Sequence, residues 1–339
     1  MNLNEDKYSQ FGLVRDMLAA VDVINTFDTN QAIEAAVAIR NVGRLMLTGE
    51  GSSRLFPAKH AIHLAGLRGW NLQLATESAR QLAEYDLTDW SVFAASNSGR
   101  TSEPIRLFQK LADTKHPQRY SLTANAHSKL ETLSTKAYVL ACGPENAVAA
   151  TKSVIAQALF YQAILEHTMG HARLKAQLGA LAGQVQQALT ARIAPDLIDT
   201  IRNAKTIYFS GRNNGVAEEL TLKTNEITRK KADFLEGTFA VHGIEEVMEA
   251  DDVVIVIDPY PDYEPKFQDV LVDRIGLAVI AIADRQTSFP TILIPRSELP
   301  GYVQMAAGWN LLVEVGLAMG VDLDHPVRAR KVGNEFVAG

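Results

Sequence analysis

Small and polar residues occupy three junctions where a predicted strand is followed by a helix. The three segments are residues 49–53, 96–101 and 143–152. Small side chains let backbone N–H groups approach a ligand, and the partial positive charge at a helix N-terminus attracts anions. Serine or threonine at a single junction of this kind is more often only an N-cap. Three such junctions on one sheet edge favour a small phosphorylated ligand.

The same segments match neither of the two standard nucleotide-binding motifs, the Walker P-loop and the dinucleotide-binding fingerprint. The Walker lysine pattern does not occur in the chain. Residues 49–54, GEGSSR, do not form a G-x-G-x-x-G fingerprint either. The residues alone therefore predict a phosphate-bearing small molecule and do not identify it.

A second group of chemically capable residues follows later in the chain. Glu219, Lys223, Glu226 and Lys230 recur at three- and four-residue spacing, which places them on one helical face. The usual meaning of this spacing is an exposed ladder of ion pairs. His242 comes next, and a lone histidine is more often structural than catalytic. A carboxylate and an imidazole near a sugar phosphate are nevertheless what proton transfer between adjacent carbons requires.

The elements that must position these residues alternate along the chain. Short apolar runs predict strands at residues 44–48, 71–75, 91–95, 119–123, 137–141, 205–210, 252–257, 277–283 and 291–295. Helical periodicity predicts helices near residues 9–26, 30–40, 54–67, 102–113, 127–133, 214–231, 264–275 and 302–319. Helix formers also fill residues 151–192, with breaks near Gly170 and Gly179. The alternation predicts α/β structure with parallel sheets.

The two alternating sections resemble each other, which indicates a duplication. Residues 44–54, RLMLTGEGSSR, align with residues 205–215, KTIYFSGRNNG, and later strands align in the same order. We therefore expect two doubly wound, flavodoxin-like domains, in which ligands bind beyond the carboxyl ends of the strands. The expected organisation is N-terminal helices at 1–40, a first domain at 41–170, a helical linker at 171–195, a second domain at 196–320 and a tail at 321–339.

Composition narrows the class of protein. The chain has 339 residues and a formal net charge of −6, which disfavours binding to nucleic acid or to an anionic membrane. The basic run at residues 229–231 is expected on a solvated helix face. Cys142 is the only cysteine, which excludes an intrachain disulfide and a tetrahedral cysteine zinc site. No secretory signal or membrane-spanning run is evident, so a cytoplasmic protein is expected.

Two quoted segments resemble a known family. Residues 95–103, ASNSGRTSE, resemble the S-x-S-G-x-T loop of the sugar isomerase (SIS) domain. Residues 143–152, GPENAVAATK, resemble the segment that follows this loop in the double-domain enzymes of the family. Those enzymes include the isomerase half of glutamine–fructose-6-phosphate aminotransferase and the fructosamine-6-phosphate deglycases. The resemblance extends from the strand at 44 to the tail.

The resemblance implies a binding role for one set of residues. The hydroxyls and amides of the loop would hold the sugar phosphate, and Ser53 would lie beside the sugar. Its neighbour Ser52 belongs to the same set of substrate- and phosphate-binding residues. A glutamate matches a carboxylate of the family's GPE turn, and the alanine that replaces a common serine removes one hydroxyl from the pocket. These residues are Ser96, Asn97, Ser98, Thr101, Ser52, Ser53, Glu145 and Ala150.

The resemblance implies a catalytic role for four others. Glu226 matches the carboxylate that moves a proton between C1 and C2, and Lys223 precedes it by three residues, as in the synthases. His242 matches a histidine that assists ring opening or leaving-group protonation, often from a neighbouring subunit. Lys331 matches the tail lysine of the synthases. Dimerisation is therefore expected, and no metal or redox cofactor is expected.

Departures from the family pattern leave alternatives open. Arg100 puts a cation in the loop where Glu or Asn is frequent, and it could contact a substrate acid or face solvent. No cysteine amidotransferase domain precedes the first strand, which favours isomerisation or cleavage of a sugar–amine adduct over glutamine-dependent synthesis. Isomerase and deglycase share the same enolisation, so the motifs do not separate them. An aminotransferase that uses free ammonia is one alternative. A sugar-phosphate sensor without catalysis is another, and the presence of Glu226 and His242 favours an enzyme over a sensor.

Overall fold

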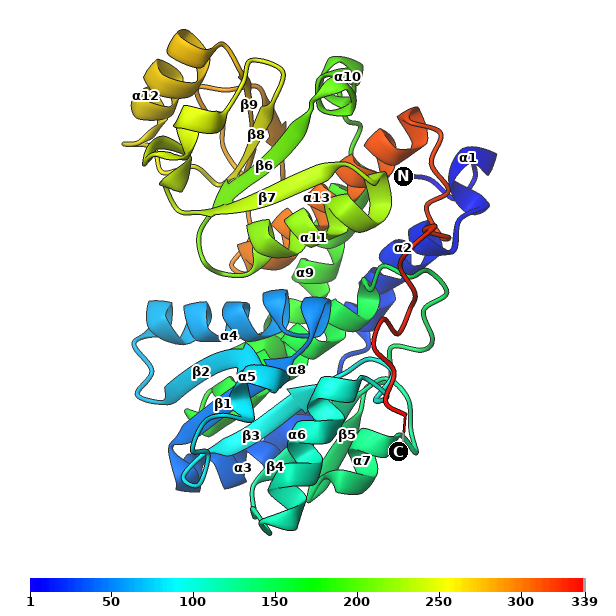
Figure 1. Cartoon of the computed structure of the whole chain (residues 1–339), viewed down its shortest axis with the longest axis vertical. Helices are drawn as coiled ribbons and strands as arrows, with labels where there is room; N and C mark the ends of the chain where they lie inside the picture. Colours follow the sequence, from blue (N-terminus) through cyan, green and yellow to red (C-terminus); the bar gives the residue numbers. More distant parts are fainter. Residues whose placement is uncertain (338–339) are drawn as a thin grey trace. The chain divides into compact units, whose positions relative to one another are not determined.

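The computed structural model describes residues 1–337 and divides into two compact units, each with its own sheet (Figure 1). The first-sheet unit comprises residues 22–145, 150–179 and the tail from Ala329 onward. The second-sheet unit comprises residues 1–21, 146–149 and 180–328. Among residues 1–337, no helix is long and apolar enough to span a bilayer.

The first sheet has five parallel strands in the order β2-β1-β3-β4-β5. Their bounds are β1 Arg44–Gly49, β2 Gln73–Ser78, β3 Ser91–Ala95, β4 Arg119–Thr123 and β5 Lys136–Val139. The helices of this unit are α3 Ile33–Val42, α4 Leu55–Arg68, α5 Ala79–Leu82, α6 Ser102–Asp113, α7 Lys129–Leu133 and α8 Lys152–Thr168, with 3-10 turns at Thr29–Ala32 and Gly51–Ser53.

The central strand β3 is buried on both faces, as expected when helices cover a parallel sheet on both sides. On one face, the Phe93 ring packs against Tyr120, Phe160 and Tyr161, the last two from α8. On the other face, Ala94 lies in a core cluster with apolar side chains of α5, α6 and α7. This packing fixes the end of β3, from which the predicted phosphate loop emerges.

The second sheet has the same topology, with the order β10-β9-β8-β6-β7 and all strands parallel. Its strands are β6 Thr206–Gly211, β7 Lys231–Glu236, β8 Val253–Ile257, β9 Ala278–Ala283 and β10 Thr291–Leu293. Its helices include α1 Asp6–Ser9, α10 Pro195–Asn203, α11 Val216–Thr228, α12 Glu264–Phe267 and α13 Pro300–Ala318; α2 Gly12–Asn25 and α9 Arg173–Thr190 cross the unit boundary. Short 3-10 turns at Phe239–Val241 and Ile244–Val247 follow β7, and a π-helical turn at Gln268–Ile275 follows α12.

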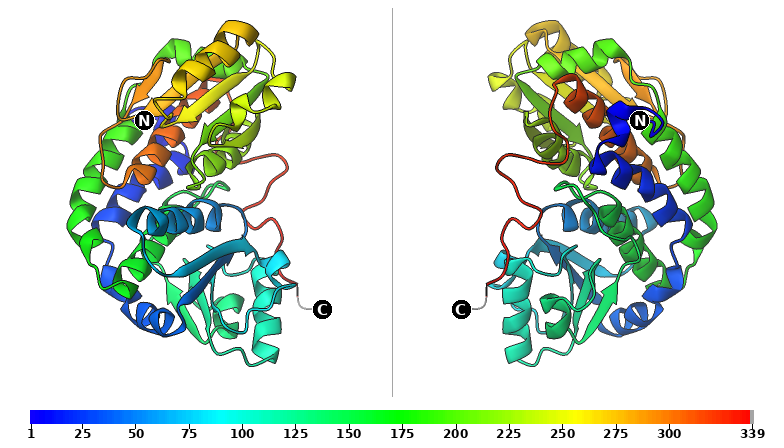
Figure 2. Two further views of the ribbon diagram at one scale, coloured as in Figure 1. Left: turned by 90° about the vertical axis from the view of Figure 1, so that its left-hand side faces the viewer. Right: turned by 90° about the vertical axis from the view of Figure 1, so that its right-hand side faces the viewer.

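The identical strand order of the two sheets confirms the predicted α/β fold and its duplication. β1, β3 and β4 correspond to β6, β8 and β9, as the sequence alignment predicted. Figure 2 shows both sheets with helices packed against them.

Two expectations about the elements are wrong, and one strand was missed. Residues 229–231 do not lie on a solvated helix face, because α11 ends at Thr228 and Arg229 takes a left-handed conformation before β7 begins at Lys231. β7 was not predicted, since it is an edge strand whose charged residues alternate with partly buried ones. Gly179 does not break the helix but lies inside α9, where a Cβ would meet no atom within 4 Å.

Candidate functional site

The loop that follows β3 is folded by its own hydroxyl groups. Ser96 Oγ accepts the Gly99 N–H at 3.1 Å and lies 3.0 Å from Thr101 Oγ1. Ser98 Oγ accepts the Arg100 N–H at 3.1 Å. Gly99 has a φ of +63°, and a Cβ there would lie 2.3 Å from the Ser128 side chain, so only glycine fits.

This loop leaves backbone donors available for a ligand. Within residues 1–337, the N–H groups of Asn97, Ser98 and Thr101 have no protein acceptor. Helix α6 begins immediately afterwards at Ser102, so its positive end adds to the field of these donors. The loop can therefore bind an anion through amides and hydroxyls without a basic side chain.

The Glu145 side chain holds the surroundings of this loop together. The carboxylate is fully buried, and Oε1 accepts the N–H groups of Thr151 and Ser153 at 2.7 and 3.1 Å. Oε2 accepts Asn97 Nδ2 at 2.7 Å, Ser153 Oγ at 2.8 Å and Lys331 Nζ at 3.2 Å. One carboxylate thus joins the loop, the start of α8 and the tail.

The pKa of Glu145 reflects these contacts. Burial raises the pKa of the carboxyl, but the positive charge of Lys331 and the hydrogen bonds from Thr151 and Ser153 outweigh burial and lower it below the ordinary value. The group is therefore held as a carboxylate whose lone pairs are taken by protein donors. It positions its neighbours, which is a different function from direct contact with a ligand.

The predicted junction at residues 49–53 lies beside α8. The 3-10 turn Gly51–Ser53 follows β1 and contacts α8, where Gln157 donates to Ser53 Oγ at 3.4 Å. Ser52 is buried, whereas Ser53 and Ala150 are partly exposed. Hydrogen bonds and contacts thus link the turn at 51–53 to α8, and Glu145 links the start of α8 to the loop after β3.

The tail forms a short antiparallel bridge with the loop, which explains Arg100. Ser102 N donates to Asn334 O and Phe336 N donates to Arg100 O, both at 2.9 Å. The Arg100 guanidinium pairs with Glu335 at 2.9 Å. In both views of Figure 2 the red tail ends beside the helices of this unit. Arg100 therefore binds the tail of its own chain.

Additional side chains fasten the tail beyond this bridge. Asn334 Nδ2 donates to Glu103 Oε1 at 2.7 Å. The Phe336 ring packs against the core cluster of α6, with the Arg106 guanidinium 5.9 Å from the ring centroid. The tail that carries Lys331 is thereby anchored next to the loop.

The second-sheet unit contains the predicted carboxylate on α11. Lys223 is fully buried, and its ammonium group lies 2.6 Å from Glu226 Oε2 and 3.2 Å from Glu219 Oε1. Burial lowers the pKa of Lys223, but the charges of Glu226 and Glu219 outweigh burial and raise it, so the side chain stays protonated. Glu219 is buried too, whereas the Glu226 side chain is 22% exposed.

This burial contradicts the interpretation of the spacing as an exposed ion-pair ladder. A surface ladder would leave the lysine in solvent, and Lys230, its fourth expected member, lies beyond the end of the helix. Oε1 of Glu226 has no hydrogen-bond partner among residues 1–337. The arrangement is a buried cation that orients one carboxylate and leaves its second oxygen available as a proton acceptor.

His242 lies in an exposed segment after β7. It follows the 3-10 turn Phe239–Val241, and its backbone N–H donates to Phe239 O at 3.1 Å. Within the described part of the chain, its ring makes no hydrogen bond with Glu226 or with any other group. The structure thus places the loop, Glu145 and Lys331 in one unit and Glu226, Lys223 and His242 in the other.

Two groups of contributors were missed by sequence reasoning. Gln157 is fully buried beside Ser53, and only the helical repeat of α8 could have indicated that it faces the turn. The tail residues Asn334, Glu335 and Phe336 act through a backbone bridge, for which a short polar segment gives no periodic signal.

Comparisons with known proteins agree with this architecture. Residues 38–167 match the family model described as SIS domain. The chain is 25% identical over 250 residues to glutamine–fructose-6-phosphate aminotransferase (isomerizing) of Lactiplantibacillus plantarum, covering 68% of this chain and 41% of that protein. It is 24% identical over 326 residues to the protein of the same name from Aeropyrum pernix, covering 87% of this chain and 51% of that protein. The chain therefore spans about half the length of these relatives or less.

Solved structures share the fold over nearly the whole chain. The C-terminal domain of glucosamine-fructose-6-phosphate aminotransferase from Francisella tularensis has a TM-score of 0.76 at 16% identity, covering 96% of this chain and 100% of that one. Tagatose-6-phosphate ketose/aldose isomerase from Escherichia coli has a TM-score of 0.75 at 20% identity, covering 95% and 98%. Glucosamine-6-phosphate deaminase from Thermotoga maritima has a TM-score of 0.72 at 17% identity, covering 96% and 99%.

Proposed function

We propose that this chain, which contains an SIS domain at residues 38–167 and is homologous to the isomerase part of glutamine–fructose-6-phosphate aminotransferase, is a phosphosugar enzyme. Its reaction would be proton transfer between C1 and C2 of a ketose, amino-sugar or fructosamine 6-phosphate. The single observation that carries the proposal is the Lys223–Glu226 pair, because a fully buried ammonium aimed at a partly exposed carboxylate is an arrangement suited to a catalytic base.

The phosphate would bind at the loop after β3. The N–H groups of Asn97, Ser98 and Thr101 would donate to its oxygens, and the start of α6 would add its positive field. The sugar would then extend toward Ser53 and Ala150 in the same unit. Glu145 would keep Asn97 and the start of α8 in place.

The proton transfer would use Glu226 as its base. Protonated Lys223 donates to Oε2 and fixes the direction of the carboxylate, which leaves Oε1 to accept the proton from one carbon and return it to the other. The intermediate would be an enediol, or an enaminol when nitrogen replaces one oxygen. Lys331 would supply a cationic group near the substrate from the tail, and His242 would exchange the proton of the oxygen or nitrogen.

Isotope exchange tests the assignment of the base. The protein would be incubated in D₂O with fructose 6-phosphate, tagatose 6-phosphate, glucosamine 6-phosphate and fructosamine 6-phosphates, and deuterium at C1 and C2 would be followed by NMR. We expect exchange in the unmodified chain and its loss in Glu226→Gln. Glu249→Gln, an exposed carboxylate of the same unit, should leave exchange unchanged. Full exchange in Glu226→Gln would disprove the base.

The products separate the remaining alternatives. Release of an amine with glucose 6-phosphate identifies a deglycase, whereas an aldose–ketose pair without amine identifies an isomerase. Product formation that requires added ammonia identifies an aminotransferase. Saturable binding of a sugar phosphate without exchange or turnover identifies a sensor and overturns the enzymatic proposal.

The exposure of His242 supports assembly into a homodimer or a larger homo-oligomer. A histidine ring that has no hydrogen-bond partner among residues 1–337 can act on a substrate held by a second copy. The test mixes the inactive variants Glu226→Gln and His242→Ala after dissociation and reassembly. We expect activity to return in the mixed oligomers, and no recovery would show that both groups act within one chain. A cytoplasmic location stays a proposal.

A further inference from the structure

The second sheet has a pocket of its own at the carboxyl ends of its strands. Gly211 at the end of β6, Gly237 after β7 and Asp258 after β8 line it, together with apolar side chains of β8 and α12. The strand order turns in opposite directions from β6 and β8, so the pocket lies at the topological switch point. Ligands of doubly wound sheets bind at this place.

The loop after β8 has a chemistry opposite to that of the loop after β3. Residues 258–262, DPYPD, replace hydroxyls and free amides by carboxylates and by two prolines, which have no N–H. The pocket is therefore unsuited to a phosphate.

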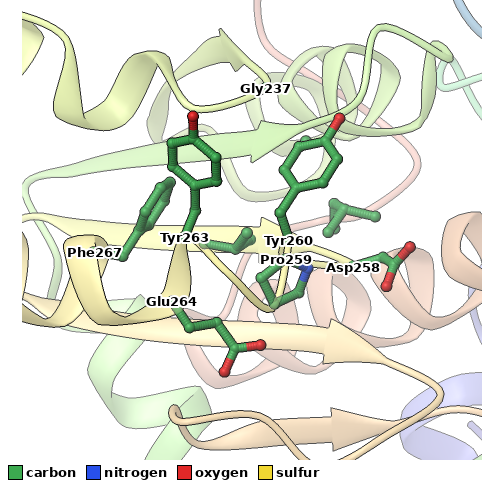
Figure 3. A pocket seen from close by; sticks show the side chains of 10 residues that line it. Gly237, Asp258, Pro259, Tyr260, Tyr263, Glu264 and Phe267 are labelled. Carbon is green, nitrogen blue, oxygen red and sulfur yellow. The ribbon is translucent and has the colours of Figure 1, made fainter.

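Two tyrosines give the pocket an aromatic side. Tyr260 and Tyr263 have ring centroids 6.4 Å apart, and Figure 3 shows both rings pointing toward Gly237. A Cβ on Gly237 would meet no atom within 4 Å, so the space in front of this residue is open. Aromatic faces of this kind stack against flat apolar surfaces.

A paired carboxylate and guanidinium lie beside the rings. Arg212 Nη1 donates to Asp258 Oδ2 and to Asp258 O, both at 2.7 Å, and its guanidinium lies 4.4 Å from the centre of the Tyr260 ring. Both side chains are about one-third exposed. They offer a planar acceptor and a planar donor to neighbouring hydroxyl groups.

The backbone at Asp258 is strained, which also indicates a functional position. Its φ is +48°, an uncommon conformation for a residue other than glycine. The hydrogen bond from Asp258 N to Ile282 O at 2.9 Å and the two bonds from Arg212 hold it there. Such strain persists where the surrounding structure fixes a group in place, and it clusters at ligand sites.

The Glu264 carboxylate is a structural member of the pocket wall. Oε1 accepts Arg285 Nη2 at 2.6 Å, and Oε2 accepts the N–H and hydroxyl of Ser288 at 2.8 and 2.9 Å. In Figure 3 this side chain points away from the two tyrosine rings. The chemistry offered to a ligand therefore comes from the tyrosines and from the Arg212–Asp258 pair.

We propose that this pocket binds an unphosphorylated monosaccharide, with the apolar face of the sugar ring on Tyr260 and adjacent hydroxyl groups on Asp258 and Arg212. The aromatic ring accounts for the apolar face, the carboxylate–guanidinium pair for the hydroxyls, and the acidic, proline-containing loop for the lack of a phosphate. This inference does not rest on the proposed function, because the site uses no residue of the phosphate loop.

Saturation-transfer NMR with glucose, galactose and N-acetylglucosamine tests the inference on the full chain. We expect saturable binding of at least one sugar, weakened about fivefold in Tyr260→Ala, as loss of an aromatic contact worth roughly 1 kcal/mol predicts. Asp258→Asn should weaken binding too, and asparagine tolerates the positive φ, so this variant keeps the test valid if Tyr260→Ala does not fold.

Two controls locate the binding site. Tyr85→Ala removes an exposed tyrosine of the first-sheet unit, and Ser98→Ala alters the phosphate loop, so both should bind the sugars as the unmodified chain does. Loss of binding in Ser98→Ala would place the sugar at the phosphate loop and overturn the proposal. No saturable binding of the three sugars, or binding of adenosine in their place, would also overturn it.

Discussion

Replacing Glu145 by glutamine tests whether this buried carboxylate holds the loop, the start of α8 and the tail together. The substitution keeps the shape of the side chain but converts one acceptor oxygen into an NH₂ donor. If the NH₂ takes the place of Oε2, three donors oppose it, namely Asn97 Nδ2, Ser153 Oγ and Lys331 Nζ. The asparagine amide and the serine hydroxyl can turn to present an oxygen, but the ammonium group cannot. If the NH₂ faces the Thr151 and Ser153 backbone, it opposes two N–H groups that cannot turn.

The expected cost follows from these conflicts. Removing one partner of a buried, hydrogen-bonded ion pair costs about 3–5 kcal/mol. The Lys331 side chain is 32% exposed, so water can solvate the freed ammonium, and we expect a loss of about 2–4 kcal/mol. At roughly 2–4 °C per kcal/mol for a domain of this size, the melting temperature should fall by about 5–15 °C.

The loss should also depend on pH, with a defined sign. The pKa of Glu145 is lowered in the folded state, so its contribution to stability is present above the ordinary carboxyl pKa and is lost as the pH falls through the folded value. The difference in melting temperature between the unmodified chain and Glu145→Gln should therefore be constant near neutral pH. It should shrink below about pH 4, where the unfolded carboxyl becomes protonated.

Thermal melts combined with hydrogen exchange measure both the size and the location of the effect. Exchange should accelerate in peptides that cover residues 150–156, because Thr151 and Ser153 donate to Glu145. Glu84→Gln is the matched control, since it breaks an exposed pair with Arg80 and should cost less than about 1 kcal/mol. Equal melting temperatures for both variants, with unchanged exchange at 150–156, would refute the reasoning.

Three other substitutions test the remaining features of the site. Arg100→Glu should accelerate hydrogen exchange of the tail by up to about fivefold, because the exposed pair with Glu335 is worth under about 1 kcal/mol. Adding Glu335→Arg should restore the protection. If protection does not return, the ion pair is not its cause. Lys223→Met should lower the unfolding free energy by about 3–5 kcal/mol by leaving Glu219 buried without its cation, and urea titration would measure this. Gly99→Ala should abolish saturable binding of fructose 6-phosphate in a calorimetric titration, because the new Cβ would collide with Ser128 and displace the loop. An unchanged affinity would show that the ligand does not bind at this loop.

The fold was largely predictable because its signals are local and repeated. β3 and β8 are short, fully buried apolar runs, and each is followed by a polar turn and a helix, so the pattern alone gives parallel sheets. β7 escaped prediction because an edge strand needs fewer apolar residues than a central one. The left-handed residue Arg229, which ends α11 two residues before β7, has no distinctive side chain.

The site was less predictable than the fold because its residues act through contacts between distant segments. Spacing placed Lys223 and Glu226 on one helical face but could not tell a solvated face from a buried one. Glu145 was expected among the substrate contacts, yet its oxygens are taken by protein donors from three segments. Arg100 had no explanation in the sequence, since its partner Glu335 lies far along the chain and is joined by backbone pairing.

The duplication explains why two domains with the same fold carry different residues after corresponding strands. A doubly wound sheet requires apolar strands and packed helices but leaves the residues at the carboxyl ends of the strands free to change. After β3 these residues became hydroxyls and open amides around Gly99, which suit an anion. After β8 they became carboxylate, proline and tyrosine, which do not suit an anion. An anion site in one copy therefore predicts nothing about its counterpart, and each strand end has to be assigned from its own donors and acceptors.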